Sequence, residues 1–75
     1  MKKLRVNTKD ATHDELVGLA RKSGFTIFEG GRHTKIKTMD GKPITTVPRH
    51  NKIKRETAKA IVETMVAFGA KIDFN

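Results

Sequence analysis

A histidine flanked by basic residues stands near the middle of the chain. His33 follows Arg32 directly, and Lys35 and Lys37 come two and four residues later. A second basic group follows further along and consists of Arg49, His50, Lys52 and Lys54. Imidazole can take up or release a proton near neutral pH, and Lys and Arg stabilise the charge of a phosphate. These residue types suit RNA cleavage, in which a base takes the 2′-OH proton, an acid protonates the leaving 5′ oxygen, and cations stabilise the charged phosphorane.

Each of these residues also has a plain structural explanation. A single histidine on a strand is most often a surface residue, and Lys35 and Lys37 are compatible with a solvated strand face. We expect His13, beside two acidic residues, to be structural or neutral. For His50 three roles stay open, namely contact with substrate, capping of the second helix or no role, and we favour a supporting role over a catalytic one. The second group in the two-proton chemistry stays open among Lys35, Lys37, His50 and water.

The composition indicates a polyanionic partner. The 75 residues include 16 Lys and Arg against 8 Asp and Glu, which gives a net charge of +8. Such a charge attracts phosphate backbones, and we favour a nucleic acid over an acidic protein because the basic residues cluster in mid-chain. The four Phe and the absence of Trp and Tyr argue against a broad aromatic platform for stacking bases.

The same composition bears on cofactors and location. The chain has no cysteine, no His-x-His pattern and no paired carboxylate cluster, so we expect no metal and no cofactor. It has no apolar run long enough to cross a membrane and no signal-peptide core after its basic start. We therefore expect a cytoplasmic protein without a membrane partner.

Periodicity and turn signals predict the elements that must position the basic residues. Thr12 and Glu15 match a capping box, which starts a helix that ends before Gly24. Three strands are predicted over 25–29, 33–39 and 43–47, with Asp40-Gly41 as a two-residue type I′ turn. A second helix follows over about 55–68. Its apolar stripe consists of Ala58, Ile61, Val62, Met65 and Phe68.

The predicted order α-β-β-β-α belongs to the α+β class. A three-stranded antiparallel sheet must cover one face, and the simplest arrangement puts both helices on the same face. Alternation then turns Ile36 toward the helices, together with its neighbours Thr34 and Thr38. The residues that it leaves on the open face are His33, Lys35 and Lys37.

We treat residues 1–75 as one domain with a core over 12–69. Residues 1–11 are predicted to be a flexible or loosely docked extension, because Leu4 and Val6 are their only large apolar side chains beyond Met1. Residues 70–75 are predicted to be a short tail, which Ile72 and Phe74 can fold back onto the core.

Four short motifs stand in order along the chain. They are Lys22-Ser23-Gly24-Phe25, Gly31-Arg32-His33, Asp40-Gly41 and Val47-Pro48-Arg49-His50. No single motif is specific, but the ordered set at these spacings resembles the HicA family of toxin mRNA interferases. The resemblance covers about residues 12–69, which is most of the chain.

The resemblance implies a fold like the double-stranded-RNA-binding domain, in agreement with the order of elements above. It implies metal-independent mRNA cleavage in which the histidine of the Gly-x-His segment, here His33, is catalytic. It also implies a HicB-type antitoxin that covers the active site. The chain departs from the family pattern at Arg32, where Ser is common, and at Glu56, where a Lys-Gly-Thr segment often has Gly.

The leading hypothesis is a toxin of a type II toxin–antitoxin system that cleaves mRNA with His33 as general acid or base. The alternative is a non-catalytic RNA-binding module on the same fold, which would need the same basic face. A basic DNA-associated or ribosome-associated protein is a third hypothesis. Cleavage of RNA in the presence of EDTA separates the first two, and a preference for duplex DNA would favour the third.

Overall fold

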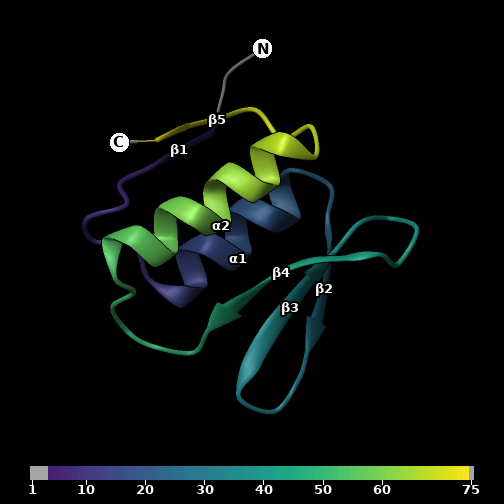
Figure 1. Cartoon of the computed structure of the whole chain (residues 1–75), viewed down its shortest axis with the longest axis horizontal. Helices are drawn as coiled ribbons and strands as arrows, with labels where there is room; N and C mark the ends of the chain where they lie inside the picture. The colour runs from purple at the N-terminus through teal and green to yellow at the C-terminus, as the bar shows by residue number, and fades with distance from the viewer. Residues whose placement is uncertain (1–3, 75) are drawn as a thin grey trace.

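The computed structural model describes residues 4–74 and contains two helices packed against one face of a three-stranded sheet (Figure 1). The helices are α1 (His13–Lys22) and α2 (Arg55–Ala67), and the strands are β2 (Thr26–Glu29), β3 (His33–Lys37) and β4 (Pro43–Pro48). The strands lie in the order β2-β3-β4, and both pairings are antiparallel. The predicted α+β class and α-β-β-β-α order are confirmed. Among the described residues, neither helix is long and apolar enough to cross a membrane.

Helix α1 begins at the predicted cap. The Thr12 hydroxyl accepts the N–H of Glu15 at 3.2 Å, which satisfies one of the free N–H groups of the first turn. Asp14 and Glu15 also place negative charge at the positive end of the helix dipole. The predicted N-terminus of the helix is therefore confirmed.

Helix α1 ends at a left-handed glycine, as predicted. Gly24 has a φ of +90°, a conformation that a Cβ atom would disfavour. Its N–H donates to the Arg21 carbonyl at 3.1 Å, and the Phe25 N–H donates to the Ala20 carbonyl at 3.0 Å. This pair of hydrogen bonds closes the helix and turns the chain into β2.

The apolar faces of both helices meet the sheet in one core. The buried side chains are Leu16, Val17, Leu19 and Ala20 from α1, Ala58, Ile61, Val62 and Met65 from α2, and Ile36 and Val47 from the sheet. The prediction that Phe68 completes the stripe of α2 was wrong, because its side chain is 46% exposed. Helix α2 ends at Ala67, and Phe68 is its C-cap residue, which turns away from the helical periodicity.

Strand β3 alternates between the two faces of the sheet as predicted. Thr34 and Ile36 are fully buried beneath the helices, whereas His33 and Lys35 are exposed. Lys37 takes the same outward direction at the end of the strand and is half-buried. The helices thus cover one face of β3 and leave the other open.

The connection between β3 and β4 differs from the predicted type I′ turn. Strand β3 ends at Lys37, and the Thr38 N–H donates to the Lys42 carbonyl at 2.9 Å across a three-residue loop. A type I′ turn needs a positive φ at both central residues, but Gly41 has one (+87°) and Asp40 does not. The Thr38 hydroxyl accepts the Lys42 N–H at 3.1 Å. Thr38 therefore stabilises the loop instead of facing the helices.

The segment before α1, predicted as a flexible or loosely docked extension, contains a short strand. Leu4–Val6 forms a strand, β1, which pairs in parallel with β5 (Ile72–Phe74). This pair lies along the helices on the side away from the three-stranded sheet (Figure 1). Residues 1–3 of the predicted extension lie outside the described residues.

The β1–β5 pair is packed and not merely adjacent. Val6 is 8% exposed, and Thr8 and Ala11 are fully buried. Ile72 is 7% exposed and Phe74 packs against the core, so the predicted return of the tail onto the core is confirmed. The burial of these side chains holds the segment before α1 in place.

A hydrogen bond joins α1 directly to the middle strand. The Nε2 atom of His13 lies 2.6 Å from the Thr34 hydroxyl, and its Nδ1 atom lies 3.1 Å from an Asp14 carboxylate oxygen. Since a carboxylate only accepts, Nδ1 donates to Asp14, and Nε2 shares the second hydrogen bond with the Thr34 hydroxyl. The bond satisfies a fully buried hydroxyl, which confirms a structural role for His13.

Replacing Thr34 with Val should lower the free energy of unfolding by about 1 kcal/mol, because His13 loses its partner. Thr46→Val is the matched control, since it makes the same change at an exposed position of β4. Urea unfolding followed by circular dichroism measures both variants. Equal midpoints for the two variants would show that the His13–Thr34 bond does not stabilise the fold.

Replacing Val6 with Asp should lower the free energy of unfolding by about 2 kcal/mol or more, because it buries a carboxylate between β1 and the helices. Asn7→Asp adds the same charge at the neighbouring exposed position and should change stability by less than about 0.5 kcal/mol. Thermal and urea unfolding measure the difference. A loosely docked segment would instead tolerate both substitutions equally.

Candidate nucleic-acid interface

His33 lies at the start of β3, where the β2–β3 turn meets the open face of the sheet. Its side chain is exposed, and its Cα partner on β4 is Pro48. In the part of the chain that the structure describes, no hydrogen bond or ion pair engages the His33 ring. Both ring nitrogens are therefore accessible to a ligand, as a general acid or base requires.

The open face beside His33 carries cations. Lys35 and Lys37 occupy the next two outward positions of β3, at intervals of roughly 6.8 Å along the strand. Arg32 is exposed in the turn directly before His33. The structure thus brings four of the predicted residues together on and beside the middle strand, at one face of the sheet. The positions that face the same side on the neighbouring strands are Thr26, Phe28, Thr46 and Pro48, none of which is acidic.

Arg49 stabilises the turn that leads into His33. Its Nη2 atom donates to the Gly30 carbonyl at 2.9 Å and forms an ion pair with the Glu29 carboxylate. These contacts tie the end of β4 to the β2–β3 turn. One guanidinium nitrogen makes both contacts, and three further N–H donors remain on a side chain that is 42% exposed. Arg49 can therefore hold the turn and contact a phosphate at the same time.

The β2–β3 turn is also packed closely at its first glycine. A Cβ atom on Gly30 would lie 3.1 Å from the His33 carbonyl oxygen. A side chain there would push on the backbone that carries the imidazole. Gly30 and Gly31 lie in the turn that joins β2 to β3, and Gly30 allows this turn to close onto His33.

The other predicted residues lie in the loop between β4 and α2. His50, Lys52 and Lys54 are all exposed. Ile53, which is 2% exposed, anchors the loop, and its N–H donates to the Ala11 carbonyl at 3.0 Å. Lys52 and Lys54 flank this anchor and form a basic edge beside the end of β4.

His50 faces a cleft that His33 does not line. The cleft has a volume of about 480 Å³, and its walls are Thr12, His13, Asp14, Arg49, His50 and Asn51. The His50 carbonyl accepts the His13 N–H at 3.4 Å, so this loop lies against the start of α1. The structure therefore places His50 at the edge of the site and His33 on the open face, with Arg49 between the two regions.

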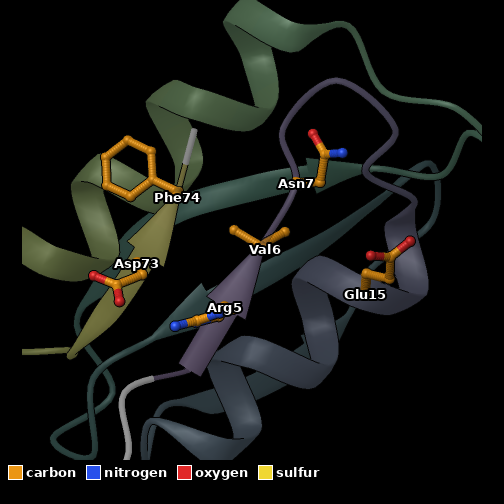
Figure 2. A pocket seen from close by; sticks show the side chains of 6 residues that line it. All are labelled: Arg5, Val6, Asn7, Glu15, Asp73 and Phe74. Carbon is orange, nitrogen blue, oxygen red and sulfur yellow. The ribbon is translucent and has the colours of Figure 1, made fainter.

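A separate cleft of about 560 Å³ lies where β1 and β5 meet the start of α1 (Figure 2). It is lined by Arg5, Val6, Asn7, Glu15, Asp73 and Phe74. Two carboxylates and one guanidinium make a wall that is unsuited to an anionic phosphate. None of the predicted site residues lines this cleft, so the open face is the better candidate. Within residues 4–74, no group of three or more His, Asp or Glu side chains could hold a metal ion.

Phe28 is a surface residue of this face that the sequence analysis did not single out. Its side chain is 52% exposed, and the ammonium of Lys37 lies 4.7 Å from its ring centroid. The sequence did contain a signal for this position. Ile27 and Phe28 are neighbours in β2, so only one of the two side chains can face the helices and the other must face outward. Ile27 packs against the core, and Phe28 therefore faces outward.

Comparison with known proteins identifies the family. The family model for the HicA toxin of bacterial toxin–antitoxin systems matches residues 14–66, a region that contains β2, β3, β4 and the basic residues of the open face. No curated protein and no solved structure matched the chain. Because the match covers more than half of the chain, the protein belongs to the HicA family of toxins from bacterial toxin–antitoxin systems.

Proposed function

We propose that this toxin is an endoribonuclease that cleaves mRNA by metal-independent transesterification, with His33 as general acid or base. The observation that carries the proposal is an exposed imidazole without a protein partner in the described residues, at the head of a cationic sheet face. The 2′ oxygen forms a bond to the adjacent phosphorus, and the bond from phosphorus to the 5′ oxygen breaks. One proton leaves the 2′-OH and another reaches the 5′ oxygen, and His33 transfers one of them.

The cations around His33 stabilise the phosphorane. Arg32 precedes it in the turn, and Lys35 follows it on the same face. Positive groups that are held in place by the sheet lower the energy of the doubly charged transition state more than that of the singly charged phosphate. The group that completes the proton transfer is Lys35, Lys37, His50 or a water molecule.

The basic edge extends the RNA contact beyond the reacting phosphate. Arg49, His50, Lys52 and Lys54 line the end of β4 and the following loop. The net charge of +8 adds a long-range attraction to the RNA backbone. These residues bind the RNA on either side of the reacting phosphate and orient it toward His33.

The protein partner of this toxin is an antitoxin, and we propose that it is of the HicB type and covers His33. An exposed cationic face favours a partner that presents acidic groups to it. Covering that face would exclude RNA without any change in the fold of the toxin.

Replacing His33 with Ala should lower the rate of RNA cleavage about 10²- to 10⁴-fold, because a general acid or base is lost. The measurement uses purified protein, a long RNA and EDTA, with gel analysis and detection of 2′,3′-cyclic phosphate ends. Lys59→Ala is the control and should keep full activity, because Lys59 is an exposed residue of α2 outside the proposed site. Binding without cleavage by the unaltered protein would instead favour a non-catalytic RNA-binding module.

Expression of the toxin in bacteria should arrest growth, and co-expression of its antitoxin should restore it. The His33→Ala variant should leave growth unaffected while it still co-purifies with the antitoxin, since the fold is unchanged. Colony counts and affinity co-purification measure the two properties. Growth arrest by the His33→Ala variant would contradict the assigned role of this residue.

A further inference from the structure

An aromatic ring lies on the cationic face of the sheet, on strand β2 beside β3. Phe28 is 52% exposed, and its Cα partner is Lys35, two residues along β3 from His33. The other three phenylalanines lie elsewhere: Phe25 and Phe74 pack against the core, and Phe68 caps the end of α2. Phe28 is therefore the aromatic side chain that a ligand on this face would meet.

The position of Phe28 is not explained by packing. Ile27 supplies the core contact of this strand, and the outward neighbour Thr26 is polar and exposed. An exposed ring beside two lysines combines an apolar surface with positive charge. A nucleotide has the complementary combination, because its base is flat and aromatic and its phosphate is anionic.

We propose that Phe28 stacks on an unpaired base of single-stranded RNA, next to the nucleotide whose phosphate His33 acts on. This inference rests on the proposed function, since it takes the substrate of the open face to be RNA. The ring lies one strand repeat, roughly 6.8 Å, from the level of His33 along the sheet. A strand of RNA that follows β3 would therefore place a base at Phe28 and its phosphates beside Lys35 and Lys37.

The contact between Lys37 and Phe28 does not prevent this stacking. An exposed cation–π pair strengthens an association about 2- to 5-fold, whereas stacking of a base on an aromatic ring contributes about 5- to 150-fold. The base therefore displaces the ammonium, which becomes available to a phosphate. The composition argues against a broad aromatic platform, but one ring is sufficient for one base.

This arrangement selects for unpaired RNA. A base in a duplex is already stacked and paired, and duplex RNA is read mainly through its backbone and shape. Phe28 can engage a base only where the strand is open. The cationic residues alone would bind either form, so the ring supplies the preference for a single strand.

The test measures binding of a labelled single-stranded 2′-O-methyl oligoribonucleotide, which lacks the 2′-OH needed for cleavage. We expect Phe28→Ala and Phe28→Leu to weaken binding about 5- to 150-fold, and Phe28→Trp to keep it, because stacking needs an aromatic ring. Phe68→Ala removes a similarly exposed phenylalanine at 46% exposure and should leave binding unchanged. Fluorescence anisotropy gives the dissociation constants, and circular dichroism checks the fold of each variant.

A scan with single abasic sites locates the stacked base. At one position, removal of the base should weaken binding to the unaltered protein about 5- to 150-fold and leave binding to Phe28→Ala unchanged. The proposal is overturned if Phe28→Leu binds as tightly as the unaltered protein, or if the abasic scan affects both proteins equally. It is also overturned if Phe28→Ala loses binding to the antitoxin and keeps full binding to RNA.

The outcome is separable from the nuclease proposal. Cleavage that depends on His33 but not on Phe28 would overturn the stacking role and leave the nuclease standing. Phe28-dependent binding to the single strand without any cleavage of ordinary RNA would support the stacking role and overturn the nuclease.

Discussion

The burial of one face of β3 beneath the helices is the constraint on which the site depends. Thr34 and Ile36 have no exposed surface, so the intervening residues must face outward. A slip of one residue would bring His33 and Lys35 into the core, where an ammonium group cannot keep its hydration. The hydrogen bond between Thr34 and His13 adds a directional contact to this apolar packing. The cationic face is thus a consequence of how the core is filled on the other side.

Much of the fold could be predicted because it is determined by residues that are close together in the sequence. Helix caps, strand alternation and the glycine at the end of α1 depend on residues within a few positions of one another, and the structure has them where expected. The faces of β3 followed from the same alternation, which is why Lys35 and Lys37 could be placed on the open side. His33 could be placed there as well, although its proposed role in catalysis came from the family resemblance and not from spacing.

Specific pairings between distant parts of the chain could not be predicted. The pairing of β1 with β5 joins opposite ends of the chain, and two strands of three residues are too short for periodicity to be visible. The ion pair of Arg49 with Glu29 depends on the closure of the sheet, so the sequence indicated the charge of Arg49 but not its bracing contacts. The β3–β4 loop was misjudged because Asp-Gly suits more than one hairpin geometry, and the side chain of Thr38 helped to decide which one formed.

The parallel β1–β5 pair forms a second, separate sheet on the outside of the helices. It lies outside the region matched by the family, on the side of the helices remote from the open face. Its buried residues Val6 and Ile72 add to the core without supplying any group to the open face of the sheet. The outer strand pair and the cationic face therefore lie on opposite sides of the helices, so a sequence change in β1 or β5 can alter the stability of the fold and leave the groups of the open face in place.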